Sequence, residues 1–160
     1  MLVLANIKLV ARLPASDFPS ENPRPQTRNF PYTLPASTKK MITIEFAKKF
    51  SENWTNDWNS HNLEKILSHY SDDFIIESPL ALKRLPETNG IVVGKENVRK
   101  YWTIGLESNT NLHFEIIDLL IGVNSITIYY SNTATGKKSA ELMIFSRDKK
   151  VIKAIVNYSE

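Results

Sequence analysis

The chain has 160 residues, 42% of them hydrophobic, which is enough for one compact domain with a buried core. It contains no cysteine, so disulfides, thiolate metal ligands and a cysteine nucleophile are all excluded. No segment approaches the run of roughly 20 apolar residues that spans a bilayer, so we expect no membrane-spanning helix.

The net charge of +3 is unevenly distributed along the chain. Residues 1–40 carry six basic and two acidic residues, whereas residues 41–160 carry 14 basic and 15 acidic residues. Because residues 41–160 show no basic stripe, we expect no nucleic-acid binding by this part of the chain. Nucleic-acid binding through the basic N-terminal segment is the alternative.

Residues 1–40 also differ from the rest in composition. They hold six of the eight prolines and none of the five glycines. Proline fixes φ and removes a backbone donor, so we interpret residues 13–40 as an extended or disordered leader. The opening MLVLANIKLVARL is a poor secretory signal, because Asn6 and Lys8 interrupt it and no basic residue precedes it.

Two interpretations of this leader stay open. It is an organelle transit peptide, or it is a non-native or upstream extension with Met41 as the working start. We favour the second interpretation, which places one domain over residues 41–160 in the cytoplasm.

The first half of this domain reads as helices. Thr43 can cap a helix whose apolar face holds Phe46, Ala47, Phe50 and Trp54, with Trp58 drifting off that face. A short second helix is expected over residues 63–70, with Asn62 as its N-cap. After a turn at residues 71–73 and a strand at residues 74–78, a loose stretch leads to a third helix over residues 95–107.

The second half reads as four strands with short connections. These strands are expected at residues 112–122, 125–133, 139–147 and 150–159, paired as antiparallel hairpins. Helices followed by a meander of strands indicate an α+β fold. We expect a curved, mostly antiparallel sheet wrapped around three helices, forming a cone with a single pocket.

Four sequence runs in this order resemble the nuclear transport factor 2-like superfamily, and most closely its SnoaL-like branch. They are NSHNLEKILSHYSDDF (59–74), ESP (77–79), GKENVRKYW (94–102) and ELMIFSRDKKVI (141–152). The resemblance covers essentially all of residues 41–160 and implies a cystatin-like α+β barrel. It says little about activity, because this fold hosts isomerases, cyclases, hydrolases and non-catalytic binding modules.

The ketosteroid isomerases of this superfamily imply three positions. Their catalytic aspartate before a proline corresponds to Ser78, and their oxyanion-hole tyrosine corresponds to Trp54. Their oxyanion-hole acid corresponds to Glu141. Since Ser78 cannot act as a base near neutral pH without an activating partner, steroid isomerase activity is not expected.

Glu141 is the main candidate for a catalytic group. Strand alternation places it on one face with Met143 and Phe145, so it is expected to lie in an apolar layer with a raised pKa. The alternatives are a place at the mouth of the cone or a basic partner. His113 is the second candidate base, although it shares a strand face with Glu115 and we favour the outer face for both.

We expect Trp54, Ser78, Tyr101 and Met143 to contact a small, mostly apolar or amphipathic ligand. No metal or other cofactor is expected, since three histidines at spacings of 8 and 44 give no ligand motif. Tyr129 and Tyr130 point to opposite faces, and the outer face is where this superfamily usually forms homodimers.

Two hypotheses about function follow. The first is a cofactor-free isomerase, cyclase or hydrolase with Glu141 as polar anchor. The second is a non-catalytic binding or dimerisation module that uses the outer face of the sheet.

Overall fold

A computed structural model describes residues 42–159, so the leader and the expected domain start at Met41 lie outside the described residues. The elements are α1 (Ile44–Asn59), α2 (Leu63–Ser68), β1 (Tyr70–Glu77), α3 (Pro79–Arg84), η1 (Pro86–Thr88), β2 (Ile91–Val93), α4 (Lys95–Glu107), β3 (Phe114–Ile121), β4 (Ser125–Asn132), β5 (Lys137–Phe145) and β6 (Val151–Tyr158). No helix in residues 42–159 is long and apolar enough to cross a membrane.

The predicted N-caps of the first two helices are confirmed. The Thr43 hydroxyl accepts a hydrogen bond from the Phe46 amide, and the Asn62 side chain accepts one from the Lys65 amide. One expectation about α1 is wrong. Trp58 does not drift off the apolar face but is 9% exposed and belongs to the core, because it lies one turn after Trp54 and packs against it.

Two boundaries between residues 70 and 90 also differ from expectation. β1 begins at Tyr70, so residues 71–73 are strand rather than turn, and Asp72 on it forms an ion pair with Lys95 at 2.6 Å. The stretch after Pro79 contains α3, because the Ser78 hydroxyl caps it and the fixed φ of Pro79 suits a first helical residue. Residues 42–159 therefore contain four α-helices where three were expected.

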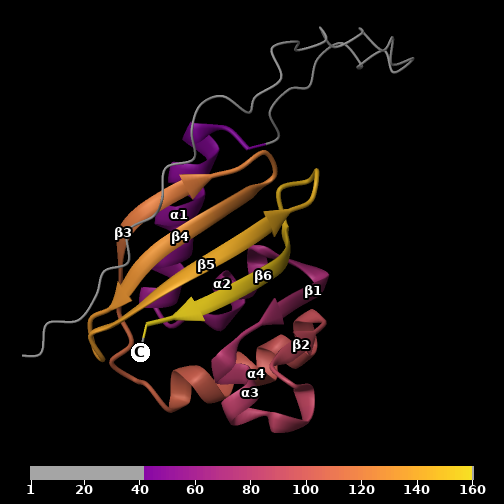
Figure 1. Ribbon diagram of the computed structural model, residues 1–160, viewed down its shortest axis with the longest axis vertical. Helices are drawn as coiled ribbons and strands as arrows, with labels where there is room; N and C mark the ends of the chain where they lie inside the picture. Colours follow the sequence, from indigo (N-terminus) through magenta and orange to yellow (C-terminus); the bar gives the residue numbers. More distant parts are fainter. Residues whose placement is uncertain (1–41, 160) are drawn as a thin grey trace, which may run out of the picture. The chain divides into compact units, whose positions relative to one another are not determined.

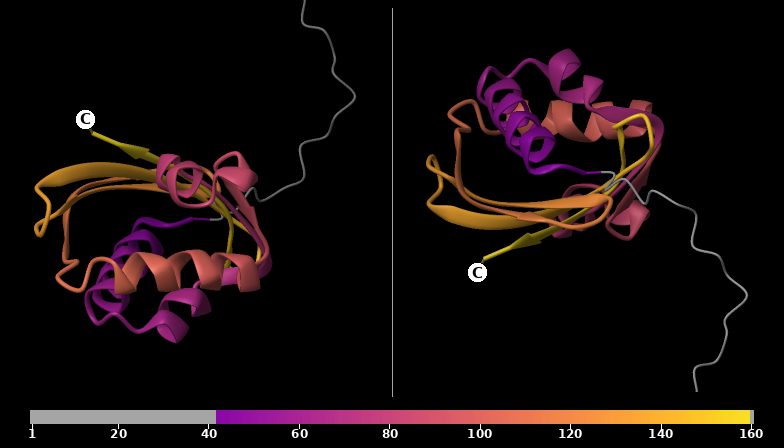
Figure 2. Two further views of the ribbon diagram at one scale, coloured as in Figure 1. Left: turned by 90° about the horizontal axis from the view of Figure 1, so that it is seen from below. Right: turned by 90° about the horizontal axis from the view of Figure 1, so that it is seen from above.

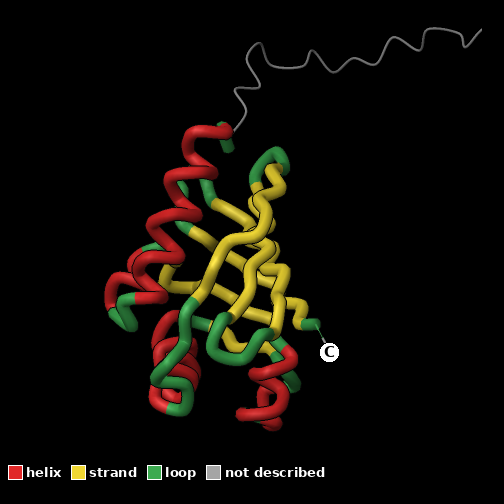
Figure 3. Tube along the Cα trace, turned by 90° about the vertical axis from the view of Figure 1, so that its left-hand side faces the viewer, coloured by secondary structure: helices red, strands yellow, loops and turns green. Residues whose placement is uncertain are grey.

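The sheet has six strands in the order β2-β1-β6-β5-β4-β3 (Figure 1). The expected hairpins of the second half are present, with β3–β4, β4–β5 and β5–β6 all antiparallel. β1 runs parallel to β6, which joins the early and late parts of the domain. The sheet is twisted and curved, and it does not close into a barrel (Figure 3).

Helices α1, α2 and α4 lie together on one side of the sheet (Figure 2). The inward positions of β5 alternate along the strand, where Ser139, Glu141, Met143 and Phe145 are all buried. Toward the end of β5 the space is filled, since the Phe145 ring lies 4.9 Å from that of Phe50 and 5.6 Å from that of Phe46. Near the start of β5 the layers enclose a cavity instead.

Candidate functional site

The cavity lies between the helices and the inner face of the sheet and has a volume of about 510 Å³. α3 and α4 supply one side of its wall, and the inner positions of β4, β5 and β6 supply another. This volume lies in the range of small-molecule sites. A second depression of about 450 Å³ lies elsewhere, beside α1 and the turn between β5 and β6.

Glu141 is the single acidic residue in the wall of the 510 Å³ cavity. It is 5% exposed, and Tyr130 Oη donates a hydrogen bond to its Oε2 at 3.3 Å. Burial raises the pKa of Glu141 to about 7, and the hydrogen bond from Tyr130 offsets only part of that effect. The carboxyl group can therefore lose or accept a proton near neutral pH.

Two tryptophans of α1, Trp54 and Trp58, lie in the buried region around Glu141. Trp54 Nε1 donates a hydrogen bond to Tyr70 Oη at 2.8 Å. Burial raises the pKa of Tyr70 well above its ordinary value, and the Glu141 charge raises it further. Trp58 lines the cavity through its ring, whereas its buried Nε1–H has no well-formed hydrogen bond among residues 42–159 and acts on the Tyr70 hydroxyl, whose pKa it lowers against the larger effect of burial.

A second group of hydroxyls lies at the end of β1. Ser78 Oγ is 3.1 Å from Tyr101 Oη and 3.4 Å from Tyr158 Oη. Burial raises the pKa of both tyrosines, so both hydroxyls stay protonated and can donate at neutral pH. Tyr101 and Tyr158 line the cavity, whereas Ser78 lies behind them and also caps α3.

The structure separates the residues that the sequence placed in one site. Glu141 and Tyr101 line the cavity, whereas Trp54 and Met143 are fully buried in the core behind it. Met143 misses the cavity because it lies two residues along β5, where aromatic side chains fill the space. His113 is exposed just before β3 and does not line the cavity.

Sequence reasoning missed Trp58, Tyr158 and Arg84 as cavity residues. The spacing of four residues from Trp54 to Trp58 could have found the first, since such residues share a helix face. The choice between Tyr129 and Tyr130 is resolved by burial, because Tyr130 faces the cavity and Tyr129 lies on the outer face.

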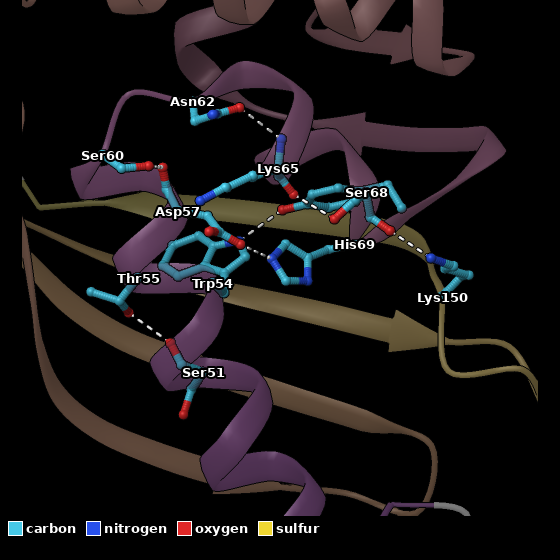
Figure 4. Close-up of polar contacts among 11 residues, drawn as sticks. Ser51, Trp54, Thr55, Asp57, Ser60, Asn62, Lys65, Ser68, His69 and Lys150 are labelled. Atoms are coloured by element: carbon cyan, nitrogen blue, oxygen red, sulfur yellow. Dashed lines mark hydrogen bonds and ion pairs between the residues drawn. The ribbon is translucent and has the colours of Figure 1, made fainter.

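The other two histidines are partly buried and tie α1 and α2 to their surroundings. His69 Nε2 lies 2.8 Å from Asp57 Oδ2 on α1, beside the Lys150 ammonium that donates to the Ser68 carbonyl (Figure 4). His61 Nε2 lies 2.8 Å from the Leu112 carbonyl oxygen. Within residues 42–159, no group of three or more potential ligands is arranged to hold a metal ion.

A profile of the SnoaL-like domain family matches residues 51–151, and the chain belongs to this family. A SnoaL-like protein of unknown function from Burkholderia thailandensis is 41% identical, with a TM-score of 0.71 over 74% of this chain and 98% of that chain. No curated protein matches the chain.

Two more distant structures share the fold alone. A candidate hydroxylase from Streptomyces galilaeus is 17% identical, with a TM-score of 0.57 over 73% of this chain and 91% of that chain. A candidate polyketide cyclase from Sinorhizobium meliloti is 6% identical, with a TM-score of 0.55 over 68% of this chain and 94% of that chain.

Proposed function

We propose that this SnoaL-like protein binds a small, mostly apolar molecule in the 510 Å³ cavity and moves a proton on it without a cofactor. The observation that carries the proposal is Glu141, a buried carboxyl group in the cavity wall with a pKa of about 7. A group with a pKa near the working pH is the most effective general acid or base.

The polar groups around Glu141 suit a carbonyl substrate. Glu141 in its ionised form can take a proton from a carbon next to a carbonyl group. The protonated hydroxyls of Tyr101 and Tyr158, which line the cavity, can donate to the oxygen on which charge develops. The other wall residues include Ile76, Leu80 and Val156, which would hold the apolar body of the substrate.

Among an isomerase, a cyclase and a hydrolase, the first two fit best. Isomerisation and cyclisation of a carbonyl compound can proceed with one group that removes and returns a proton. Hydrolysis needs an activated water as well, and the cavity has only one acidic residue to serve as base. The similarity in fold to a candidate polyketide cyclase is consistent with this order.

The test is hydrogen exchange next to a carbonyl group. 1-Tetralone is incubated with the protein in D2O, and loss of its C2 proton signal is followed by NMR at several pD values. We expect exchange faster than in buffer, controlled by a group with a pKa of about 7. Glu141→Gln should slow it by roughly 100-fold or more, a usual share for general base catalysis.

The control variant is Glu115→Gln, which changes an exposed carboxylate on β3 and should leave the exchange rate unaltered. Saturation-transfer NMR on the same samples separates binding of 1-tetralone from turnover. Equal rates in wild-type and Glu141→Gln protein would refute a role for Glu141 in proton transfer.

A second candidate function is association through the outer face of the sheet. Tyr129, Leu142 and Ile155 alternate with buried residues on β4, β5 and β6, so they point outward, and each is partly exposed. The strand pairing places Leu142 opposite Ile155 on β6 and opposite Thr127 on β4, with Tyr129 diagonally across from Leu142. Apolar side chains gathered on an exposed face support an interaction surface there.

A further inference from the structure

The cavity wall has three cationic side chains that the proposed proton transfer does not use. Lys83 and Arg84 come from the last turn of α3, and Lys137 comes from the start of β5. Among residues 42–159, none of the three forms an ion pair with a carboxylate. The only acidic residue in the wall is the buried Glu141.

Arg84 is the best fixed of these cations. Its side chain is partly buried, and Nη2 donates a hydrogen bond to Ser108 Oγ at 3.1 Å. The guanidinium packs on α4 where residue 105 is glycine, because a Cβ at Gly105 would lie 3.0 Å from Arg84 Nη1. Since a guanidinium has five N–H donors, the bond to Ser108 leaves most of them for a ligand.

The charge of Arg84 acts on the cavity side of the wall. It lowers the pKa values of Tyr101 and Tyr158 against the larger effect of burial, which raises both. Arg84 therefore lies close enough to these hydroxyls for its field to act on a group bound beside them. Lys83 and Arg84 could instead stabilise the C-terminus of α3. That role would not require Arg84 to lie beside the tyrosine hydroxyls, and it would not explain why Lys137 also lies in the cavity wall.

We infer that the natural ligand is an organic anion, with its apolar body in the cavity and a carboxylate held by Arg84 between Lys83 and Lys137. The planar guanidinium matches a carboxylate through two parallel hydrogen bonds, and the two exposed lysines add long-range attraction. This inference rests on the proposed function, because it names the substrate class of the same cavity.

The experiment compares two probes of one shape. 2-Naphthoate carries the negative charge, and 2-naphthamide replaces the carboxylate by an uncharged amide. Binding of each is measured by calorimetry at low ionic strength. We expect 2-naphthoate to bind about tenfold more tightly than 2-naphthamide. This factor is at the lower end of the range for a hydrogen bond to a charged group, because Arg84 is partly exposed. Added salt should weaken binding of 2-naphthoate and not of 2-naphthamide.

Arg84→Gln should abolish the difference between the two probes, whereas Arg147→Gln, which removes an exposed charge outside the cavity, should preserve it. Gly105→Ala tests the same contact without changing any charge, and because its Cβ would press on Arg84 Nη1 it should reduce the preference by less than Arg84→Gln does. Lys137→Gln, far from α3 in sequence, serves if Arg84→Gln does not fold.

The outcomes separate the two proposals. Equal affinity for both probes, unchanged in Arg84→Gln, would overturn the anionic ligand and leave the cavity's binding function intact. Binding of neither probe at millimolar concentration would count against both. A preference for 2-naphthoate that survives in Arg84→Gln and in Lys137→Gln would place the anion elsewhere and also overturn the inference.

Discussion

Glu141 has an environment that favours its neutral form in the folded protein. The side chain is buried beside Tyr130, and among residues 42–159 it receives its single hydrogen bond from that hydroxyl. Tyr70, Tyr101 and Tyr158 are close enough for the Glu141 charge to raise their pKa values. The tyrosines and Glu141 thus oppose one another's ionisation, and the cavity stays uncharged at its centre below neutral pH.

This environment predicts a pH-dependent stability. The pKa of Glu141 is raised from 4.5 to about 7 in the folded state, so the folded state binds the proton more tightly than the unfolded state. The stability from this group is present below pH 4.5 and is lost as pH rises from there to about 7. The loss is roughly 3 kcal/mol, from 1.36 kcal/mol per pKa unit.

The measurement is urea unfolding of wild-type and Glu141→Gln protein between pH 4 and 8. The two proteins differ at this one side chain, so the difference between the two curves isolates the contribution of Glu141. We expect the wild-type protein to lose stability relative to Glu141→Gln as pH rises. Parallel curves would show that the carboxyl group is ionised in the folded state as easily as in the unfolded chain.

At the scale of single residues, the sequence predicted burial better than it predicted the site. The alternation of Glu141 with Met143 and Phe145 correctly placed all three on the inner face. It could not tell which of them borders a cavity, because that depends on whether Phe46 and Phe50 reach across to fill the space. Such contacts join distant segments and leave no local pattern.

α3 is the element that positions the candidate site. Ser78 starts the helix by accepting a hydrogen bond from the Leu80 amide, and it also contacts Tyr101 and Tyr158. The same helix places Lys83 and Arg84 in the cavity wall. One serine therefore links the end of β1, the first turn of α3 and two cavity tyrosines.

Ser78→Ala should destabilise the protein by about 2 kcal/mol, from the lost cap and a buried hydrogen bond. The matched control is Thr43→Ala, which removes only the exposed cap of α1 and should cost about 1 kcal/mol. Both values come from denaturant unfolding followed by circular dichroism. Equal losses in the two variants would mean that the Ser78 contacts with the tyrosines add nothing to stability.

Sequence patterns located most elements but missed α3. The caps of α1 and α2 and the bounds of α4 follow from local residue preferences, and the structure confirms them. The strand predicted at residues 74–78 ends just before Pro79, but proline both ends a strand and begins a helix. Asp72 and Asp73 favour a turn locally, and they lie where the register of β1 against β6 shifts between Tyr70 and Ile75, with Asp72 held by its ion pair to Lys95.

At the scale of the molecule, the two faces of the sheet carry different features. The inner face carries the core and the cavity, whereas the outer face carries the patch of Tyr129, Leu142 and Ile155. The hypotheses of a small-molecule site and of an association surface are therefore compatible, since they use opposite faces of the same strands.

If the outer face forms a homodimer, Leu142→Arg should convert it to a monomer, because a buried unpaired charge is strongly unfavourable at an interface. Sedimentation velocity at micromolar concentration measures the change, and circular dichroism checks that the fold is retained. The control is Glu52→Arg on the exposed side of α1, which should leave the assembly unchanged. A wild-type protein that sediments as a monomer would rule out this dimer.

The overall topology was only partly accessible from sequence. Short connections predicted the three antiparallel hairpins, because residues close in the chain pair at little entropic cost. The parallel pairing of β1 with β6 places Ile76 beside Ala154, and no local feature of either strand predicts this pairing. That pairing places β6 between the two halves of the sheet.

The central place of β6 has a consequence during synthesis of the protein. β1 and β2 emerge from the ribosome early, and β3, β4 and β5 follow, but these two sets have no strand between them until β6 has emerged. The nascent chain would therefore hold two incomplete half-sheets with open edges, which are prone to pairing with other chains. Val156 and Tyr158 also complete the cavity wall, so the candidate site can form only as the last strand arrives.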